Sequence, residues 1–235
     1  MSLPILVTPK YTLTIPSTGK TITFRSFLVK EEKILLIAQE SGNNEEIISA
    51  MKNIISACTF SAVDPDSLAS FDLEYIFLKL RSKSVGEIAE LSCKCSKCEA
   101  FTKTTLNLEE IKFDLDPKKD KIIMLTEKIG INMKYIQVRD MTVLMNENRD
   151  RGDMITDVVI ASIASIFDEN GVYPSEQTSR EEMDTFINSL NRQQMNLIET
   201  FIAEAPKLTH KIKFVCKSCK EENIIELSGA QSFFE

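Results

Sequence analysis

Leu91-Ser-Cys-Lys-Cys-Ser-Lys-Cys98 is one of two segments that decide how this chain folds. The other is Ile212-Lys-Phe-Val-Cys-Lys-Ser-Cys219, which repeats the final cysteine spacing after a similar strand-like lead. A C-x-x-C turn can direct two sulfur atoms at one point, and two such turns form a tetrahedral four-cysteine zinc site. The pattern predicts one metal site built from two distant parts of the chain. Its predicted ligands are Cys95, Cys98, Cys216 and Cys219.

The expected role of the metal is structural. Four thiolates fill the coordination sphere of Zn²⁺ and leave no position for a substrate or an activated water. A redox-active dithiol and unrelated core cysteines are the alternatives. Two other residues, Cys93 and His210, could replace one of these ligands. Cys93 could replace Cys95, although it aligns with Phe214 as an inward-facing strand residue, and His210, the only histidine, precedes the second cysteine pair.

The residues around the cysteine pairs are unusual in two respects. Glu99 and Lys220 follow the second cysteine of each pair, where zinc ribbons commonly have glycine. Lysines also gather near the sulfurs, and their charge would offset the double negative charge of a zinc tetrathiolate. These lysines are Lys94, Lys97, Lys213, Lys217 and Lys220.

Length and charge limit the class of protein. A chain of 235 residues can bury a sizeable core without disulfides, so its six cysteines do not indicate a secreted disulfide framework. It contains no apolar run of transmembrane length, and we expect a soluble protein in a reducing cytoplasm. The net charge of -7 argues against a chain built as a whole to bind nucleic acid or anionic membrane.

The N-terminal part predicts a β-hairpin followed by three helices. Tyr11–Ile15 and Thr21–Phe24 alternate apolar with polar residues around a turn at 16–19. Ser17-Thr-Gly-Lys-Thr21 imitates the end of a phosphate-binding loop, but a strand pattern follows it where that motif requires a helix. Helical patterns then cover Val29–Gln39, Ile47–Cys58 and the region around Leu73–Leu80, which completes an N-terminal unit over 1–90.

The spacing of the two cysteine pairs implies the remaining architecture. Segments 91–110 and 208–235 must come together as a zinc-ribbon-like module, with 111–207 as a mainly helical insertion between them. In that insertion, apolar residues from Ile155 to Phe167 predict a helix, and Ser179 with Glu182 predicts a helix-capping box. Asp114–Asp120 resembles a calcium loop only faintly and is interpreted as a solvated turn. The expected fold class is α+β.

We find no constellation of residues that indicates catalysis. With a single histidine the chain cannot form a Ser-His-Asp or Cys-His arrangement away from the cysteine region. Acidic pairs such as Glu45-Glu46 and Glu181-Glu182 stand at expected helix starts, where carboxylates interact favourably with the helix dipole. A protein that is not an enzyme and has no small-molecule substrate is therefore expected.

Several longer motifs resemble one known family. The chain is similar to the T4-type bacteriophage baseplate proteins, a family of small hub and hub-assembly proteins of contractile tails. The resemblance spans nearly the whole chain and is strongest at its two ends. It is carried by Leu3-Pro-Ile-Leu-Val-Thr-Pro-Lys-Tyr11, Pro16-Ser-Thr-Gly-Lys20, Phe24-Arg-Ser-Phe-Leu-Val-Lys-Glu-Glu-Lys33, Phe71-Asp-Leu-Glu-Tyr-Ile-Phe-Leu78, Arg81-Ser-Lys-Ser-Val-Gly86 and Leu227-Ser-Gly-Ala-Gln-Ser-Phe-Phe234.

The resemblance implies a role in building the central hub of the baseplate. We expect an assembly factor or chaperone that contacts hub or tape-measure proteins in the host cytoplasm, and a permanent hub subunit in the virion tail is the alternative. A nucleic-acid-binding zinc-ribbon regulator is the competing hypothesis, based on the lysines near the cysteines. Homo-oligomerisation stays open. The tail residues Phe233 and Phe234 either pack on the protein's own core or anchor a partner.

Overall fold

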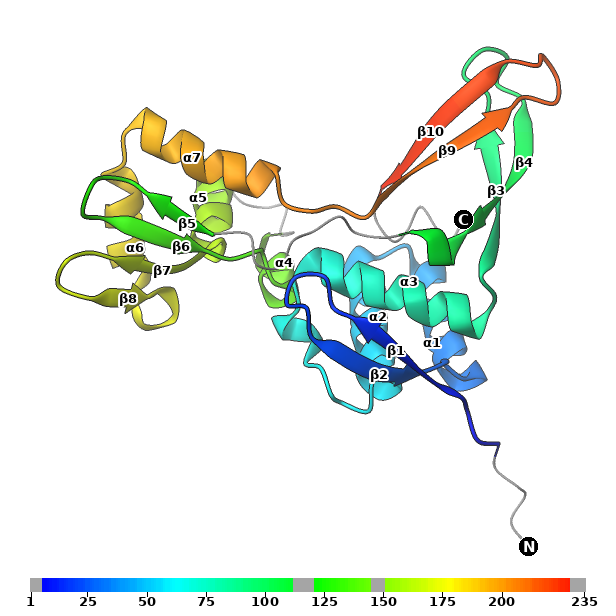
Figure 1. Ribbon diagram of the computed structural model, residues 1–235, viewed down its shortest axis with the longest axis horizontal. Helices are drawn as coiled ribbons and strands as arrows, with labels where there is room; N and C mark the ends of the chain where they lie inside the picture. The colour runs from blue at the N-terminus through cyan, green and yellow to red at the C-terminus, as the bar shows by residue number, and fades with distance from the viewer. Residues whose placement is uncertain (1–5, 112–120, 145–150, 229–235) are drawn as a thin grey trace, which may run out of the picture. The chain divides into compact units, whose positions relative to one another are not determined.

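The computed structural model describes residues 6–111, 121–144 and 151–228. The predicted calcium-like segment Asp114–Asp120 and the tail residues Phe233 and Phe234 lie outside these ranges. The fold is α+β, as predicted, with small antiparallel sheets and several helices (Figure 1). None of the helices in the described ranges has the length and hydrophobicity needed to cross a bilayer.

The chain divides into two units. The first consists of Met1–Pro65, Phe71–Pro117 and Pro206–Glu235, and the second of Asp66–Ser70 and Lys118–Ala205. The first unit therefore contains both the N-terminal hairpin with its helices and the two cysteine pairs. The division expected from the sequence, with boundaries near 90, 110 and 208, stays a prediction.

The N-terminal hairpin consists of β1 (Lys10–Thr14) and β2 (Thr21–Arg25), which pair antiparallel with Thr14 opposite Thr21. The turn between them contains the letters that imitate a phosphate-binding loop. Its Ser17 donates its backbone N–H to Oδ1 of Asp72 at 3.0 Å and its hydroxyl to Oδ2 of the same carboxylate. Asp72 is fully buried in the helix Ser70–Ser84 (α3), so these bonds hold the turn against that helix.

Three α-helices complete the N-terminal part, as predicted. They are α1 (Val29–Ser41), α2 (Asn44–Cys58) and α3 (Ser70–Ser84), with a 3-10 turn, η1 (Pro65–Ser67), before the last. Gly42 ends α1 with φ 65°, a left-handed conformation that glycine adopts without strain. On α2, the predicted apolar stripe places Ile54, Ile55 and Cys58 in the core at 1% exposure or less.

Two further hairpins carry the cysteine pairs. The first consists of β3 (Ile88–Lys94) and β4 (Phe101–Asn107), followed by η2 (Leu108–Glu110), and the second of β9 (Thr209–Val215) and β10 (Glu222–Ser228). Alternate residues of their strands face inward, and Figure 1 shows the two hairpins side by side. Together with Leu78 of α3 they form one core, whose strand residues include Ala89, Leu91, Cys93, Leu106, Ile212 and Phe214.

The second unit combines a sheet with helices. The sheet has the order β5 (Ile122–Met124), β6 (Gly130–Met133), β7 (Ile163–Phe167) and β8 (Val172–Pro174), all antiparallel. Its core joins residues of the sheet to residues of the helices, among them Ile131, Ile163, Met183 and Ile198. The helices are α4 (Val138–Leu144), α5 (Arg151–Ala161), α6 (Arg180–Asn188) and α7 (Arg192–Ala203), with η3 (Ser175–Gln177) before α6.

The predicted helix through Phe167 is wrong in its second half. Helix α5 ends at Ala161, and the N–H of Ser162 closes its last turn on the carbonyls of Val158 and Val159. Residues Ile163–Phe167 form β7, because Ile163 pairs with Met133 of β6 and Ile166 pairs with both Ile131 of β6 and Tyr173 of β8. The predicted capping box is confirmed: Ser179 and Glu182 bond reciprocally at the start of α6.

Candidate metal centre

Each cysteine pair lies in a tight turn that joins the two strands of its hairpin. In the first turn, the N–H of Cys95 donates to the carbonyl of Ala100 at 3.0 Å and the N–H of Glu99 donates to the carbonyl of Cys95 at 3.1 Å. The second turn repeats both bonds: Cys216 donates to Glu221 at 2.9 Å, and Lys220 donates to Cys216 at 3.0 Å. The two turns are therefore built in the same way.

This turn requires a left-handed residue after its second cysteine. Glu99 has φ 59° and Lys220 has φ 62°. Such angles favour glycine, because a side chain there meets the backbone. Glu99 and Lys220 adopt these angles although neither is glycine, which leaves two strained residues beside the sulfurs.

The turns bring the four predicted ligand atoms together. The Sγ atoms of Cys95, Cys98, Cys216 and Cys219 all lie within 4.8 Å of one another. Across the two hairpins, Cys95 Sγ lies 3.6 Å from Cys219 Sγ, and Cys98 Sγ lies 3.6 Å from Cys216 Sγ. In a tetrahedral site with Zn–S bonds of about 2.3 Å, neighbouring sulfurs are roughly 3.8 Å apart. The arrangement of the donors therefore fits a tetrahedrally bound cation.

The backbone favours thiolates at the first cysteine of each turn. N–H groups of Cys98 and Lys97 lower the pKa of Cys95, and those of Cys219 and Ser218 lower the pKa of Cys216 to about 6. At Cys219 the Glu221 N–H also favours the thiolate, but the neighbouring sulfurs outweigh it and raise the pKa to about 12. Four sulfurs this close cannot all ionise without a cation between them, because like charges raise one another's pKa.

Asn223 joins the two turns, although its residue type alone does not mark it as part of a metal site. This residue of β10 is 5% exposed. Its Oδ1 accepts the N–H of Ser96 at 2.9 Å and the Ser96 hydroxyl at 2.8 Å, while its Nδ2 donates to the Glu221 carbonyl at 2.9 Å and faces Cys95 Sγ at 3.5 Å. One amide thus holds a ligand sulfur and the backbone of both turns. Such contacts orient metal ligands.

Thr102 occupies the equivalent place in the first hairpin. It stands four residues after Cys98, as Asn223 stands four residues after Cys219. Its hydroxyl accepts the N–H of Lys217 at 3.3 Å, the counterpart of the bond from Ser96. Extending the alignment of the two cysteine segments by four residues would have found both positions.

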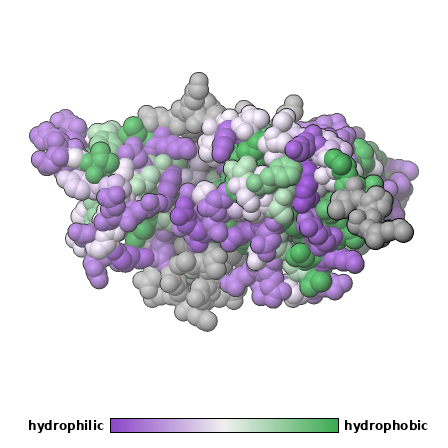
Figure 2. Space-filling model, turned by 90° about the horizontal axis from the view of Figure 1, so that it is seen from below, coloured by the Kyte–Doolittle hydropathy of each residue, from purple (hydrophilic) through white to green (hydrophobic). Residues whose placement is uncertain are grey.

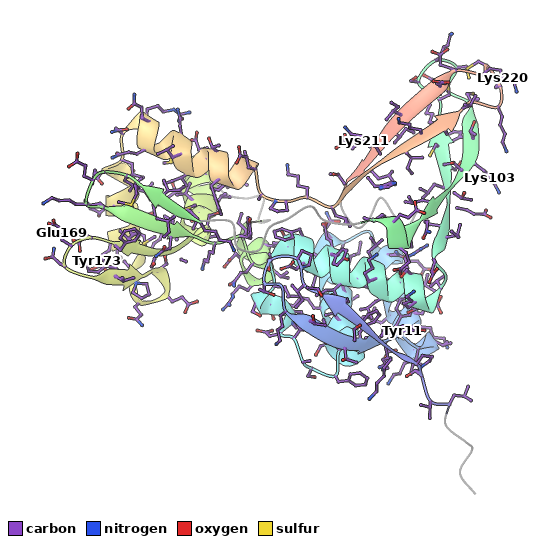
Figure 3. The ribbon with its side chains drawn as sticks, viewed as in Figure 1. Tyr11, Lys103, Glu169, Tyr173, Lys211 and Lys220 are labelled. Atoms are coloured by element: carbon purple, nitrogen blue, oxygen red, sulfur yellow. The ribbon has the colours of Figure 1, made fainter. Side chains whose placement is uncertain are left out.

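Ion pairs neutralise part of the lysine charge around the sulfurs. Lys97 contacts Glu221 of the other turn at 2.7 Å, and Lys94 contacts Glu99 at 3.1 Å. Further lysines stand on the two hairpins, as Figure 3 shows for Lys103 on β4, Lys211 on β9 and Lys220 in the second cysteine turn. The cluster of sulfurs therefore lies among positive charges, of which some have carboxylate partners.

The two remaining cysteines and the histidine are not part of the cluster. Cys93 is buried in the core between the hairpins, and burial raises its pKa. His210 lies in β9 opposite Leu227, near the end of the hairpin remote from the turn. Cys58 is fully buried in α2, and burial raises its pKa to about 11, as expected for an inert core thiol.

Comparison with known protein families gives a match over nearly the whole chain. The family model of the T4 bacteriophage base plate protein matches residues 8–235, which include both cysteine turns and both units of the chain. No curated protein and no solved structure matches the chain. The match confirms the resemblance carried by the sequence motifs.

Proposed function

Since the chain belongs to the T4 bacteriophage base plate protein family, we propose that it helps to build the central hub of the baseplate through protein–protein contacts. The family match is the observation that supports this proposal. Membership associates the chain with the virion tail and with other structural proteins of the phage. The role we prefer is an assembly factor or chaperone for a hub or tape-measure protein. The family description, a base plate protein, favours a permanent hub subunit as the second candidate.

The surface of α1 supports a role in protein contacts. Val29, at the start of this helix, is 65% exposed, and Leu36 and Ile37 within it are 51% and 67% exposed. Elsewhere hydrophilic residues predominate on the face drawn in Figure 2, and hydrophobic residues form separate patches between them. Exposed apolar patches on soluble proteins commonly mark interaction sites. A contact of this kind suits a protein that holds partner chains and carries out no chemistry.

The proposed role of the cysteine cluster is to hold this scaffold together with a structural Zn²⁺. Cys95, Cys98, Cys216 and Cys219 supply four sulfur ligands, and tetrahedral sulfur sites are typical of zinc. The ion would join two hairpins that are remote in sequence, so its binding free energy would also stabilise the fold. The surrounding lysines then balance the charge of the site.

Capture from infected cells would test the proposal. A tagged chain should co-purify with hub or tape-measure proteins, and mass spectrometry of finished virions decides between the two roles: absence there indicates an assembly factor, and presence indicates a subunit. Ile37→Glu should reduce capture without lowering the melting temperature, whereas Glu40→Gln, on the same helix, should leave capture unchanged. If neither the cells nor the virions show the chain with a baseplate protein, the proposal is wrong.

The charge-balance hypothesis and the nucleic-acid hypothesis make different predictions for the lysines near the cysteines. If they balance thiolate charge, binding to DNA or RNA should be weak, indifferent to sequence and lost at moderate salt, because counterions compete for phosphate contacts. Fluorescence anisotropy with duplex and single-stranded probes at increasing salt measures this. Tight, sequence-dependent binding at physiological salt would favour a regulator.

A further inference from the structure

A second candidate site lies in the second unit, where residues of the β7–β8 hairpin and of α6 line a groove. The groove begins as a cavity of about 430 Å³ and continues along α6 as a hollow of about 390 Å³. Glu182 and Phe186 line both spaces, so the two are continuous. Each volume falls within the range of ligand-binding clefts, roughly 300–1,000 Å³.

The sequence of α6 turns one face to the core and the next face to the groove. Met183 and Ile187, four residues apart, are 2% and 5% exposed and belong to the core of this unit. Glu182 and Phe186, each one position earlier, lie on the adjoining face that lines the groove. Phe186 also packs against the core, which holds its ring in the wall.

The β7–β8 hairpin adds apolar and aromatic surface. Ile166 of β7 and Tyr173 of β8 are paired in the sheet, and both line the cavity together with Ile129. Tyr173 is 44% exposed, and its hydroxyl donates to Oδ1 of Asp168 at 3.3 Å. Figure 3 shows Tyr173 on this hairpin. An exposed ring beside a carboxylate offers a surface on which a flat cation stacks.

The groove is lined by three carboxylates, those of Asp168, Glu181 and Glu182. Asp168 accepts hydrogen bonds from neutral groups of its own turn, and Glu182 accepts the N–H and the hydroxyl of Ser179, each at 2.9 Å. These bonds lower the pKa of Asp168 and of Glu182, so both are ionised at neutral pH. Neutral donors hold the two carboxylates in place without cancelling their charge.

The cations that stand next to the groove in the sequence are paired with other carboxylates. Lys128 contacts Glu169 at 3.0 Å, and Arg180 contacts Asp157 and, at 2.9 Å, Asp184. Within the described part of the chain, no lysine or arginine lines the groove. A cation from another molecule would therefore complement its charge.

We infer that this groove binds a basic segment of a partner protein, with an arginine side chain in the cavity. The guanidinium binds the carboxylates of Asp168 and Glu182 and stacks on the ring of Tyr173, and apolar residues beside the arginine contact Ile129 and Phe186. Arginine suits the site better than lysine, because its planar fork can donate to carboxylates while its flat face covers a ring. The inference rests on the proposed function in that the partner is another structural protein of the baseplate.

Three blocked peptides test the groove on the purified full chain. The probe is acetyl-Leu-Ala-Arg-Ala-Leu-amide, and its controls replace arginine by lysine or by citrulline, which has the shape of arginine without its charge. Binding is followed by NMR chemical shifts, which should concentrate at Ile129, Tyr173 and Phe186. The probe should bind about tenfold or more tightly than the citrulline peptide, which lacks charge-assisted hydrogen bonds. The lysine peptide should fall between them.

Conservative variants remove the charge and keep the local structure. Asp168→Asn with Glu182→Gln retains the turn and the capping box, because asparagine forms such turns and glutamine serves in such boxes. It should weaken the arginine probe by about tenfold or more and leave the citrulline peptide unchanged. Glu40→Gln with Glu46→Gln makes the same change in net charge at two exposed positions of the first unit and should not alter binding. Tyr173→Ala should weaken both peptides, because each loses the ring.

Four outcomes would overturn the inference. The arginine probe would bind no better than the citrulline peptide, the two double variants would weaken it equally, Tyr173→Ala would bind as the wild type does, or the shifts would lie away from the groove. Thermal melts of each variant show that it is folded. Because the peptide assay uses no phage protein, its result is independent of hub capture. A failed assay with intact capture rejects the groove alone, and a specific assay without capture rejects the proposed function.

Discussion

The backbone N–H of Ser96 donates to the side chain of Asn223 at 2.9 Å, so a residue of the second cysteine hairpin holds the turn of the first. The reverse bond runs from the N–H of Lys217 to Thr102 at 3.3 Å. Each turn therefore depends on the other for one of its hydrogen bonds. These reciprocal bonds tie together the two turns that carry the sulfurs.

Replacing Asn223 should loosen the metal site. Asn223→Ala leaves the N–H of Ser96 and the carbonyl of Glu221 without their partner, which should cost about 1–3 kcal/mol of folding stability. It also removes an orienting contact to Cys95, so a chelator should extract the metal roughly tenfold faster or more. Chelator-monitored metal release and thermal melts measure the two effects.

Two matched variants separate positioning from stability. Thr102→Val removes the single equivalent bond and should have the smaller effect on both measurements. Asn223→Asp keeps an acceptor for Ser96 but places a negative charge near Cys95. It should therefore speed metal release clearly while lowering the melting temperature only a little. Equal metal retention in Asn223→Ala and the wild type would contradict the positioning role.

The purified chain should contain one zinc ion. Elemental analysis should find one Zn²⁺ per chain, and Cys95→Ser or Cys219→Ser should remove the metal together with much of the stability, because the ion joins distant segments. Cys58→Ala and Cys93→Ser should keep the metal, since both thiols lie in the core. A metal-free preparation that melts like the wild type would refute the structural site, and metal loss in Cys93→Ser would show that the ligands are misassigned.

The sequence predicted the cysteine cluster well, because two short turns with repeated flanks determine their own local geometry. Their reciprocal bonds were harder to predict, since Asn223 and Thr102 differ in chemistry and only their equivalent position relates them. The helix predicted through Phe167 failed for a different reason. Apolar residues at 155–167 satisfy a helical period, but Ile163 and Ile166 pair with β6, which lies about thirty residues earlier in the chain, and periodicity does not report such long-range pairing.

Glycine after each cysteine pair should stabilise the protein. Lys220 has φ 62°, and Lys220→Gly would relieve the strain of a side chain in the left-handed region. We expect a gain of about 1 kcal/mol, which is roughly 2–4 °C in melting temperature for a chain of this size. Glu99→Gly should gain less, because it also loses the ion pair with Lys94. Lys217→Gly, in the same turn but without a positive φ, should lower the melting temperature. A lower melting temperature in Lys220→Gly would contradict the strain argument.

The ion pair between Arg25 and Glu31 should make the stability of the first unit depend on pH. The two side chains are 13% and 6% exposed and lie 2.9 Å apart. Burial alone would raise the pKa of Glu31, but the bonds from Arg25 and from the N–H of Leu28 outweigh it and lower the pKa below its ordinary 4.5. A carboxyl group whose pKa is lowered on folding stabilises the protein above its unfolded pKa. That contribution is lost as the pH falls from about 4.5 through the lower, folded value.

Glu31→Gln should therefore lower the melting temperature at pH 7, since it leaves the charge of the largely buried Arg25 without its partner. The difference from the wild type should shrink below pH 4.5 and vanish once Glu31 is protonated in the folded protein, because the neutral acid and the amide are then alike in charge. Glu40→Gln, at an exposed position of the same helix, provides the control and should show no such dependence. Thermal melts of the three proteins between pH 3 and pH 7 measure the effect. A constant difference in melting temperature between Glu31→Gln and the wild type over that range would show that the loss of stability does not come from the ion pair.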